Sequence, residues 1–126
     1  NLNQNYKILL AVDDSPGTKK AIKYGVRVAQ AFNNKVEILT ISEEKNISDQ
    51  CVQASNRAEK MLRRSGIDFD KNYKVGEPVK TIIDTAADDH IIIMGASSQS
   101  PLAKFFMGSK PLSVMKNCNC PVLIVK

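Results

Sequence analysis

The 126-residue chain contains no tryptophan, one histidine and three cysteines. An odd number of cysteines without a Cys-x-x-Cys pair is typical of reduced thiols and not of a disulfide framework. A zinc site normally combines several cysteine and histidine ligands, and no such cluster occurs along this chain. The sequence therefore argues against a disulfide scaffold, and we expect no metal centre built from protein side chains.

Long apolar runs are also missing. The longest one spans only a few residues, far fewer than the roughly 20 that a membrane-spanning helix needs. The N-terminal residues 1–5 lack the apolar stretch of a secretory signal. We therefore expect a cytoplasmic protein with no membrane contact. A hydrophobic fraction of 43% in a chain of this length can build one core, so we expect a single domain over residues 1–126.

The formal net charge of +5 raises the possibility of a nucleic-acid partner. A phosphate-binding surface needs clustered cations, but here the basic residues are spread among acidic ones on predicted helices. Only three tyrosines and four phenylalanines are present for stacking on bases. This distribution favours solvated helix faces over nucleic-acid binding. The basic residues concerned are Lys19, Lys20, Lys23, Arg27, Arg63 and Arg64.

Short apolar segments alternate with amphipathic ones along the whole chain. The predicted strands are Lys7–Val12, Val36–Ile41, a less regular one from Ile67 to Val75, Ile91–Met94 and Val122–Val125. The predicted helices run from near Pro16 to Phe32, from Ser48 to Ser65, from about Val79 to Ala87, and from Gly108 onward. Parallel strands need crossovers of helix length, so the pattern predicts an α/β fold with a doubly wound, five-stranded parallel sheet covered by helices on both faces.

Ligands of such sheets bind beyond the carboxyl ends of the strands, which directs attention to two loops. One runs from Asp13 to Thr18, and the other, unusually long, runs from Gly95 to Ser109. Gly95 can take a positive φ and let a ligand approach the backbone. Gly108 and Ser109 would present free amides and a hydroxyl at a helix N-terminus. The second loop therefore predicts a phosphate site.

Four segments of the chain resemble the universal stress protein family. ATP-binding members carry Gly-x-x-Gly, nine residues, and then Gly-Ser or Gly-Thr. This chain has Gly95-Ala96-Ser97-Ser98, nine residues and Gly108-Ser109, so the spacing matches and Ser98 stands in place of the second glycine. The other similar segments are Val12-Asp13-Asp14-Ser15, Val75-Gly76-Glu77-Pro78 and Cys120-Pro121-Val122-Leu123-Ile124-Val125. Matching order and spacing at four places is far more specific than a single glycine motif.

The resemblance implies strand order 3-2-1-4-5, as in adenine nucleotide alpha hydrolase-like folds, a homodimer formed through the fifth strand, and ATP binding in stress adaptation. It also implies a role for each matching residue. Asp13 would hold the ribose or adenine, Val12 would offer its backbone and an apolar wall, and Ile41 would close the adenine pocket. Gly95, Gly108 and Ser109 would cradle the phosphates, with Ser98 in the glycine position and Lys110 either adding a cation or pointing into solvent. Magnesium or manganese would bind only through the phosphates.

Alternative interpretations remain open at this point. Asp13 and Asp14 could simply end a strand and cap the next helix. Ser98 could obstruct the phosphates, which would make the protein a dimeric interaction module without nucleotide. More remotely, the chain could be an enzyme acting on the ATP α-phosphate. No catalytic base other than Asp13 and no P-loop lysine is evident, so we assign no catalytic residue and expect at most slow hydrolysis. We interpret His90 as structural or exposed, and Cys118 and Cys120 as ordinary thiols.

Overall fold

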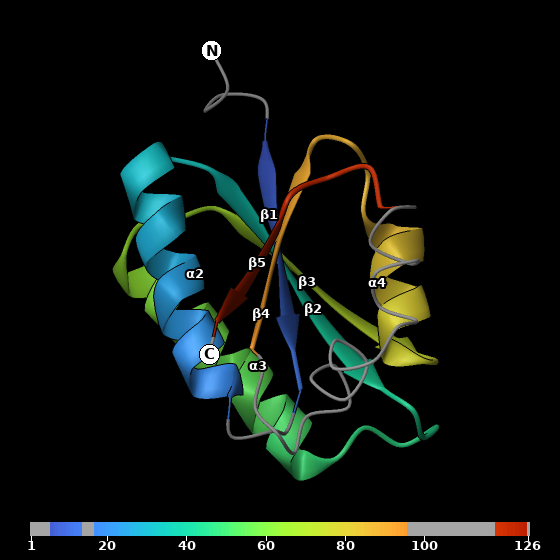
Figure 1. Ribbon diagram of the computed structural model, residues 1–126. Helices are drawn as coiled ribbons and strands as arrows, with labels where there is room; N and C mark the ends of the chain where they lie inside the picture. The colour runs from blue at the N-terminus through green and yellow to red at the C-terminus, as the bar shows by residue number, and fades with distance from the viewer. Residues whose placement is uncertain (1–5, 14–16, 96–117, 126) are drawn as a thin grey trace.

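The computed structural model describes residues 6–13, 17–95 and 118–125. Its elements are β1 (Lys7–Val12), α2 (Thr18–Phe32), β2 (Lys35–Ser42), α3 (Asp49–Arg64), β3 (Phe69–Val75), α4 (Pro78–Thr85), β4 (His90–Gly95) and β5 (Val122–Val125). The five strands form one sheet in the order β3-β2-β1-β4-β5, and every neighbouring pair is parallel (Figure 1). The predicted sheet and its strand order are therefore confirmed. The helix predicted from Gly108 onward lies outside the described residues.

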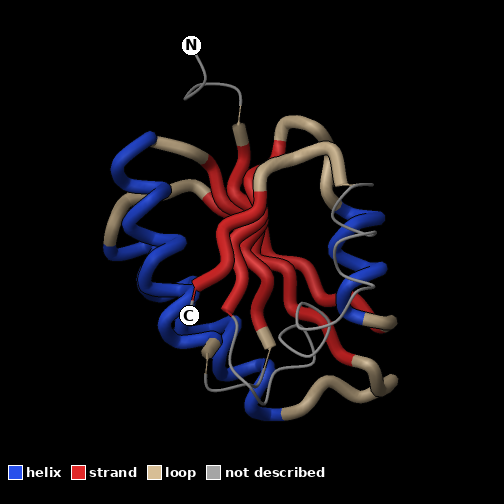
Figure 2. Tube along the Cα trace, viewed as in Figure 1, coloured by secondary structure: helices blue, strands red, loops and turns tan. Residues whose placement is uncertain are grey.

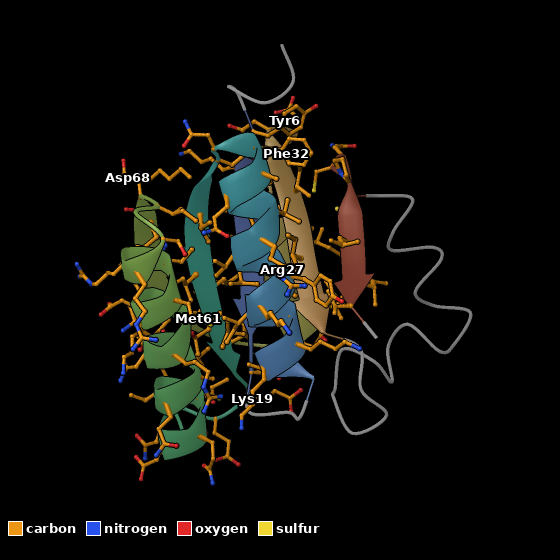
Figure 3. The ribbon with its side chains drawn as sticks, turned by 90° about the vertical axis from the view of Figure 1, so that its left-hand side faces the viewer. Tyr6, Lys19, Arg27, Phe32, Met61 and Asp68 are labelled. Atoms are coloured by element: carbon orange, nitrogen blue, oxygen red, sulfur yellow. The ribbon has the colours of Figure 1, made fainter. Side chains whose placement is uncertain are left out.

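The sheet lies between two helical layers (Figure 2). Helices α2 and α3 pack side by side on one face, and α4 covers the other (Figures 1 and 3). Lys19 and Arg27 of α2 are exposed, in agreement with the prediction that the basic residues occupy solvated helix faces.

The central strand β1 is buried on both sides because helices cover both faces of the sheet. Ile8, Leu10 and Val12 contribute to the core beneath α2 and α3, whereas Leu9 and Ala11 contribute to the core beneath α4. All five side chains are at most 3% exposed. Burying one such aliphatic side chain stabilises the fold by roughly 1.5–3 kcal/mol, which explains why this strand is a continuous apolar run.

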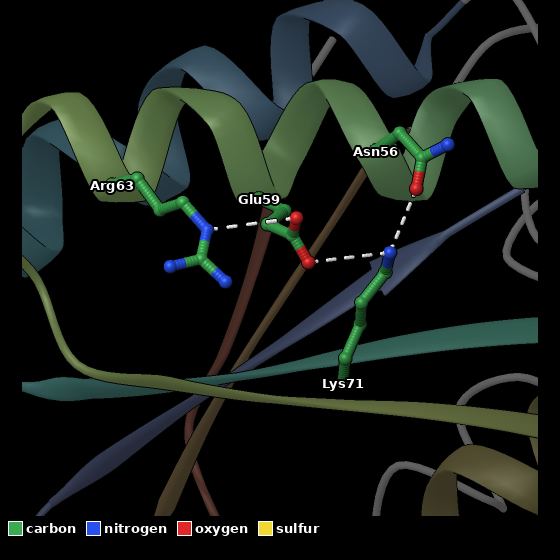
Figure 4. A network of polar contacts seen from close by, with 4 residues as sticks. All are labelled: Asn56, Glu59, Arg63 and Lys71. Atoms are coloured by element: carbon green, nitrogen blue, oxygen red, sulfur yellow. Dashed lines mark hydrogen bonds and ion pairs between the residues drawn. The ribbon is translucent and has the colours of Figure 1, made fainter.

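The edge strand β3 is largely exposed, which explains its irregular pattern in the sequence. Polar contacts attach it to α3 (Figure 4). Lys71 Nζ donates to Asn56 Oδ1 at 2.7 Å and lies 3.4 Å from Glu59 Oε1, while Arg63 Nε lies 3.6 Å from Glu59 Oε2. These groups are partly solvated, so each pair contributes no more than about 1 kcal/mol.

Helix α3 begins and ends at the residues that the sequence indicates. The Ser48 side chain caps the helix by accepting a hydrogen bond from the Cys51 amide at 3.2 Å. At the other end, Gly66 adopts a φ of 68°, and the amides of Gly66 and Ile67 donate to the carbonyls of Arg63 and Leu62. This pair of bonds is a Schellman motif, which favours glycine because of the positive φ.

Candidate functional site

A pocket of about 240 Å³ opens at the carboxyl ends of β1 and β2. Its wall includes Val12 and Asp13 from the end of β1, Ile41 from the end of β2, and Cys51 from the first turn of α3. Pro78, the first residue of α4, also lines it. The pocket therefore occupies the edge of the sheet at which parallel α/β folds bind their ligands.

The strand register explains why residues far apart in the chain meet here. Val12 pairs with Thr40, so β1 and β2 end side by side. Val12 is 2% exposed and belongs to the core beneath α2 and α3, whereas Ile41 is 6% exposed and belongs to the core beneath α4. The pocket wall thus includes residues that belong to the cores on both faces of the sheet. The structure brings together three of the predicted site residues, Val12, Asp13 and Ile41.

The Asp13 carboxylate is held by the first turn of α2. Thr18 Oγ1 donates to Asp13 Oδ1 at 2.7 Å and accepts from the Asp13 amide at 3.1 Å. Thr18 is 4% exposed, so this contact is shielded from solvent on one side. Gly17, and not Asp13, occupies the N-cap position of α2. Asp13 therefore ends the strand and keeps its carboxylate in a defined orientation at the pocket wall.

The charge of the described pocket wall is negative. Besides Asp13 it includes Glu43 and Glu44, and the described residues that line it include no lysine or arginine. Carboxylates accept hydrogen bonds from hydroxyl and amino groups and repel phosphates. This part of the wall therefore suits an uncharged, donor-rich group, and a phosphate would be accommodated elsewhere.

Gly95 lies at the end of β4 and approaches the loop that precedes α2. A Cβ atom on Gly95 would lie 2.6 Å from the carbonyl oxygen of Gly17. Gly95 does not use the positive φ that is open to glycine, because only Gly66 and Gly76 have positive φ among the described glycines. The glycine is needed here because another backbone passes against it. This contact places the first residue of the second predicted loop against Gly17 of the first.

Most of the predicted phosphate cradle lies outside the described residues. The cradle residues concerned are Ser98, Gly108, Ser109 and Lys110. Asp14, in the first predicted loop, also lies outside the described residues. Within the described part of the chain, Gly95 alone represents the glycine motif.

The pocket wall also contains residues that were not predicted from the sequence as site residues, among them Glu43, Glu44 and Cys51. The glutamates follow the carboxyl end of β2, so the rule that singled out Asp13 after β1 could also have singled them out. Cys51 carries no comparable signal, because its position in the pocket depends on how α3 packs against the sheet.

His90 lies at the opposite end of the sheet, at the start of β4. It is 7% exposed, and its Nδ1 accepts a hydrogen bond from the Ala87 amide at 2.7 Å. The interpretation of His90 as a structural residue is therefore confirmed. Among residues 6–13, 17–95 and 118–125, no group of three or more metal-ligating side chains occurs, and no helix is long and apolar enough to cross a membrane.

Comparison with known proteins yields one consistent family. The sequence model of the universal stress protein family matches residues 5–126. Universal stress protein MJ0577 of Methanocaldococcus jannaschii is 30% identical over 122 residues, which cover 94% of this chain and 75% of that protein. Its solved structure superposes with a TM-score of 0.67 at 28% identity, covering 97% of this chain and 96% of the other.

Two further solved structures contain a nucleotide. A universal stress protein in complex with cAMP has a TM-score of 0.72 and 24% identity, with 96% of each chain covered. A universal stress protein from Archaeoglobus fulgidus in complex with dAMP has a TM-score of 0.67 and 20% identity, with 96% of this chain and 98% of that chain covered. At these identities the similarity establishes a shared fold.

Proposed function

Because the chain belongs to the universal stress protein family, we propose that it is a regulatory module that binds an adenine nucleotide, ATP in the first instance, in stress adaptation. The observation that carries the proposal is the meeting of Val12, Asp13 and Ile41 in one pocket at the carboxyl edge of the sheet. The complexes of two structural neighbours with cAMP and dAMP support an adenine nucleotide as the ligand class.

The pocket suits the nucleoside end of such a ligand. Its volume of about 240 Å³ is below the roughly 300–1,000 Å³ of pockets that enclose a whole drug-sized ligand. Val12 and Ile41 would contact the flat apolar faces of adenine, and the oriented Asp13 carboxylate would accept a hydrogen bond from a ribose hydroxyl. Glu43 and Glu44 would accept bonds from the remaining donors.

The phosphates would extend away from this acidic wall, toward the end of β4. Gly95 leads from there into the segment that contains Ser98, Gly108, Ser109 and Lys110, to which we assign the phosphate contacts. Magnesium or manganese would bind through the phosphates. We propose binding with at most slow hydrolysis, because the chain carries no P-loop lysine signature that would stabilise phosphoryl transfer.

The second proposal concerns assembly. Strand β5 is an edge of the sheet, and Leu123 on it is 41% exposed. An edge strand presents unpaired backbone groups and can pair with a second copy. We propose a homodimer formed through β5. The same dimer would form in the alternative case, in which the protein is an interaction module that does not bind a nucleotide.

The central test is direct binding. One sample of protein purified without added nucleotide is denatured by heat, and its supernatant is separated by ion exchange; a second, native sample is titrated with ATP, AMP and adenosine by calorimetry. We expect released adenine nucleotide or measurable binding of ATP. Because the chain lacks tryptophan, a retained nucleotide would also raise the absorbance at 260 nm noticeably. Absence of both release and binding at millimolar ATP would favour the interaction module.

A further inference from the structure

Two cysteine side chains contact each other at the amino end of β5. Cys118 Sγ and Cys120 Sγ are 3.4 Å apart, and both residues are free thiols of intermediate exposure. Because the strands are parallel, this end of the sheet is opposite to the edge that forms the pocket. The thiol pair is therefore a separate feature, and its chemistry does not depend on nucleotide binding.

The surrounding structure holds the two thiols in place. Both cysteines pack against the core beneath α4. Pro121, the next residue, accepts a hydrogen bond through its carbonyl from the Ile92 amide at 2.9 Å, which ties this segment to β4. Cys118 Sγ also lies 3.8 Å from the Cys120 carbonyl oxygen. Both sulfurs are thus fixed before any reaction occurs.

The contact gives the two thiols different roles. Burial, the hydrogen bond with Cys118 and repulsion from that neighbouring sulfur raise the pKa of Cys120 to about 12. Cys120 therefore holds its proton at neutral pH, and its S–H can donate to the Cys118 sulfur. Because thiol–disulfide exchange begins with a thiolate, we assign the attack to Cys118 and the resolving step to Cys120.

We propose that Cys118 and Cys120 form a redox-active dithiol that low-molecular-weight disulfides convert to an intramolecular disulfide. The Cys118 thiolate attacks one sulfur of the small disulfide, forms a mixed disulfide and expels the first small thiolate, which takes up a proton. Cys120 then loses its proton to water, attacks the Cys118 sulfur and expels the second small thiolate. The protein loses two electrons and two protons, and the small disulfide becomes two thiols.

The geometry favours this product over the alternatives. A disulfide requires the sulfurs to approach to about 2.05 Å, a movement of roughly 1.4 Å from their present contact. Metal binding is less well supported, because no cluster of three ligating side chains occurs in the described part of the chain. Cys51 is 4% exposed and lies in the pocket at the other end of the sheet, so it is not a competing partner.

The test uses the reduced wild-type protein and millimolar oxidised glutathione, followed by alkylation, tryptic digestion and mass spectrometry. Trypsin releases both cysteines in the single peptide 117–126, and Cys51 in a different one. We expect that peptide to be lighter by two hydrogen atoms, with this form about tenfold more abundant than its glutathione adducts. Adducts as abundant as the disulfide, or thiols that stay reduced while the denatured chain oxidises, would overturn the proposal.

Two single variants separate the roles of the thiols. Cys120→Ser leaves the attacking thiol without its resolving partner, so we expect a stable glutathione adduct on Cys118. In Cys118→Ser burial, the largest cause, still raises the pKa of Cys120, so we expect its adduct to form about tenfold more slowly. Equal rates in the two variants would overturn the assignment of Cys118 as the attacking group. The wild-type experiment decides the proposal even where a variant is unstable.

Discussion

At the scale of single residues, the strongest feature is the oriented carboxylate of Asp13. Its contact with Thr18 determines where it points, and its neighbours on the pocket wall, Glu43 and Glu44, add like charge. Asp13 can therefore accept a hydrogen bond from a sugar hydroxyl and can also repel a phosphate. A comparison of adenosine, which has no phosphate, with ATP separates these two effects.

We predict that Asp13→Asn weakens adenosine binding about tenfold, because a charge-assisted hydrogen bond is lost while the shape is kept. The loss for ATP should be smaller, because the variant also removes repulsion of the phosphates. Calorimetry with both ligands measures the difference. Asp84→Asn is the matched control, since it removes an equal charge from the exposed side of α4, outside the pocket wall. Unchanged adenosine affinity in Asp13→Asn would contradict the assigned contact.

Gly95 offers a second residue-scale test. We predict that Gly95→Ala destabilises the fold by about 2 kcal/mol, because the new Cβ would lie 2.6 Å from a backbone oxygen that cannot rotate away. Gly25→Ala is a suitable comparison: its Cβ would meet the flexible end of Leu10 at 3.0 Å, and alanine favours the helix. Urea denaturation measures the free energy of unfolding of both variants. Equal values would contradict the prediction, because they would mean that the loop before α2 moves away from the new Cβ at little cost.

At the scale of elements, the boundaries of α3 are specified by residues at its two ends. Ser48 satisfies an amide at the start, and Gly66 completes the Schellman motif at the end. No atom lies within 4 Å of the position that a Cβ on Gly66 would take. A side chain at position 66 would therefore change the free energy of unfolding through the backbone conformation that it disfavours, and not through a steric clash.

We predict that Gly66→Ala costs about 1 kcal/mol, since alanine is disfavoured at a φ of 68°. For a domain of this size the melting temperature should fall by roughly 3–5 °C. Gly66→Asn should cost less, because asparagine tolerates the left-handed conformation. Thermal unfolding followed by circular dichroism measures both, and a larger loss for asparagine than for alanine would contradict the explanation.

At the scale of the whole molecule, the sheet has two different edges. The β3 edge is tied to α3 by the contacts of Lys71, and Val75 on it is 53% exposed. On the β5 edge Leu123 is 41% exposed, and the proposed dimer contact lies there.

We predict that Leu123→Lys converts the dimer to a monomer, because a charge would be buried in the paired edges. Val75→Lys on β3 is the matched control, since Val75 is 53% exposed at the other edge. Light scattering coupled to size exclusion gives the mass of each variant. A monomeric wild type, or a dimer that survives Leu123→Lys and dissociates in Val75→Lys, would refute the assignment.

Much of the fold could be predicted from the sequence because local burial leaves a local pattern. The continuous apolar runs of β1 and β4 predicted strands covered on both faces, and the periodic apolar residues of α2 and α3 predicted amphipathic helices. The family resemblance supplied the strand order, and it proposed as site residues Val12, Asp13 and Ile41, which line one pocket in the structure.

Only the tertiary structure decided which distant residues meet. The entry of Cys51 into the pocket and the passage of Gly17 against Gly95 depend on strand register and helix packing. Sequence periodicity reports whether a residue faces the core or the solvent, which is a property of its own element. Contacts between elements follow from the relative placement of whole strands and helices, and no single segment carries that information.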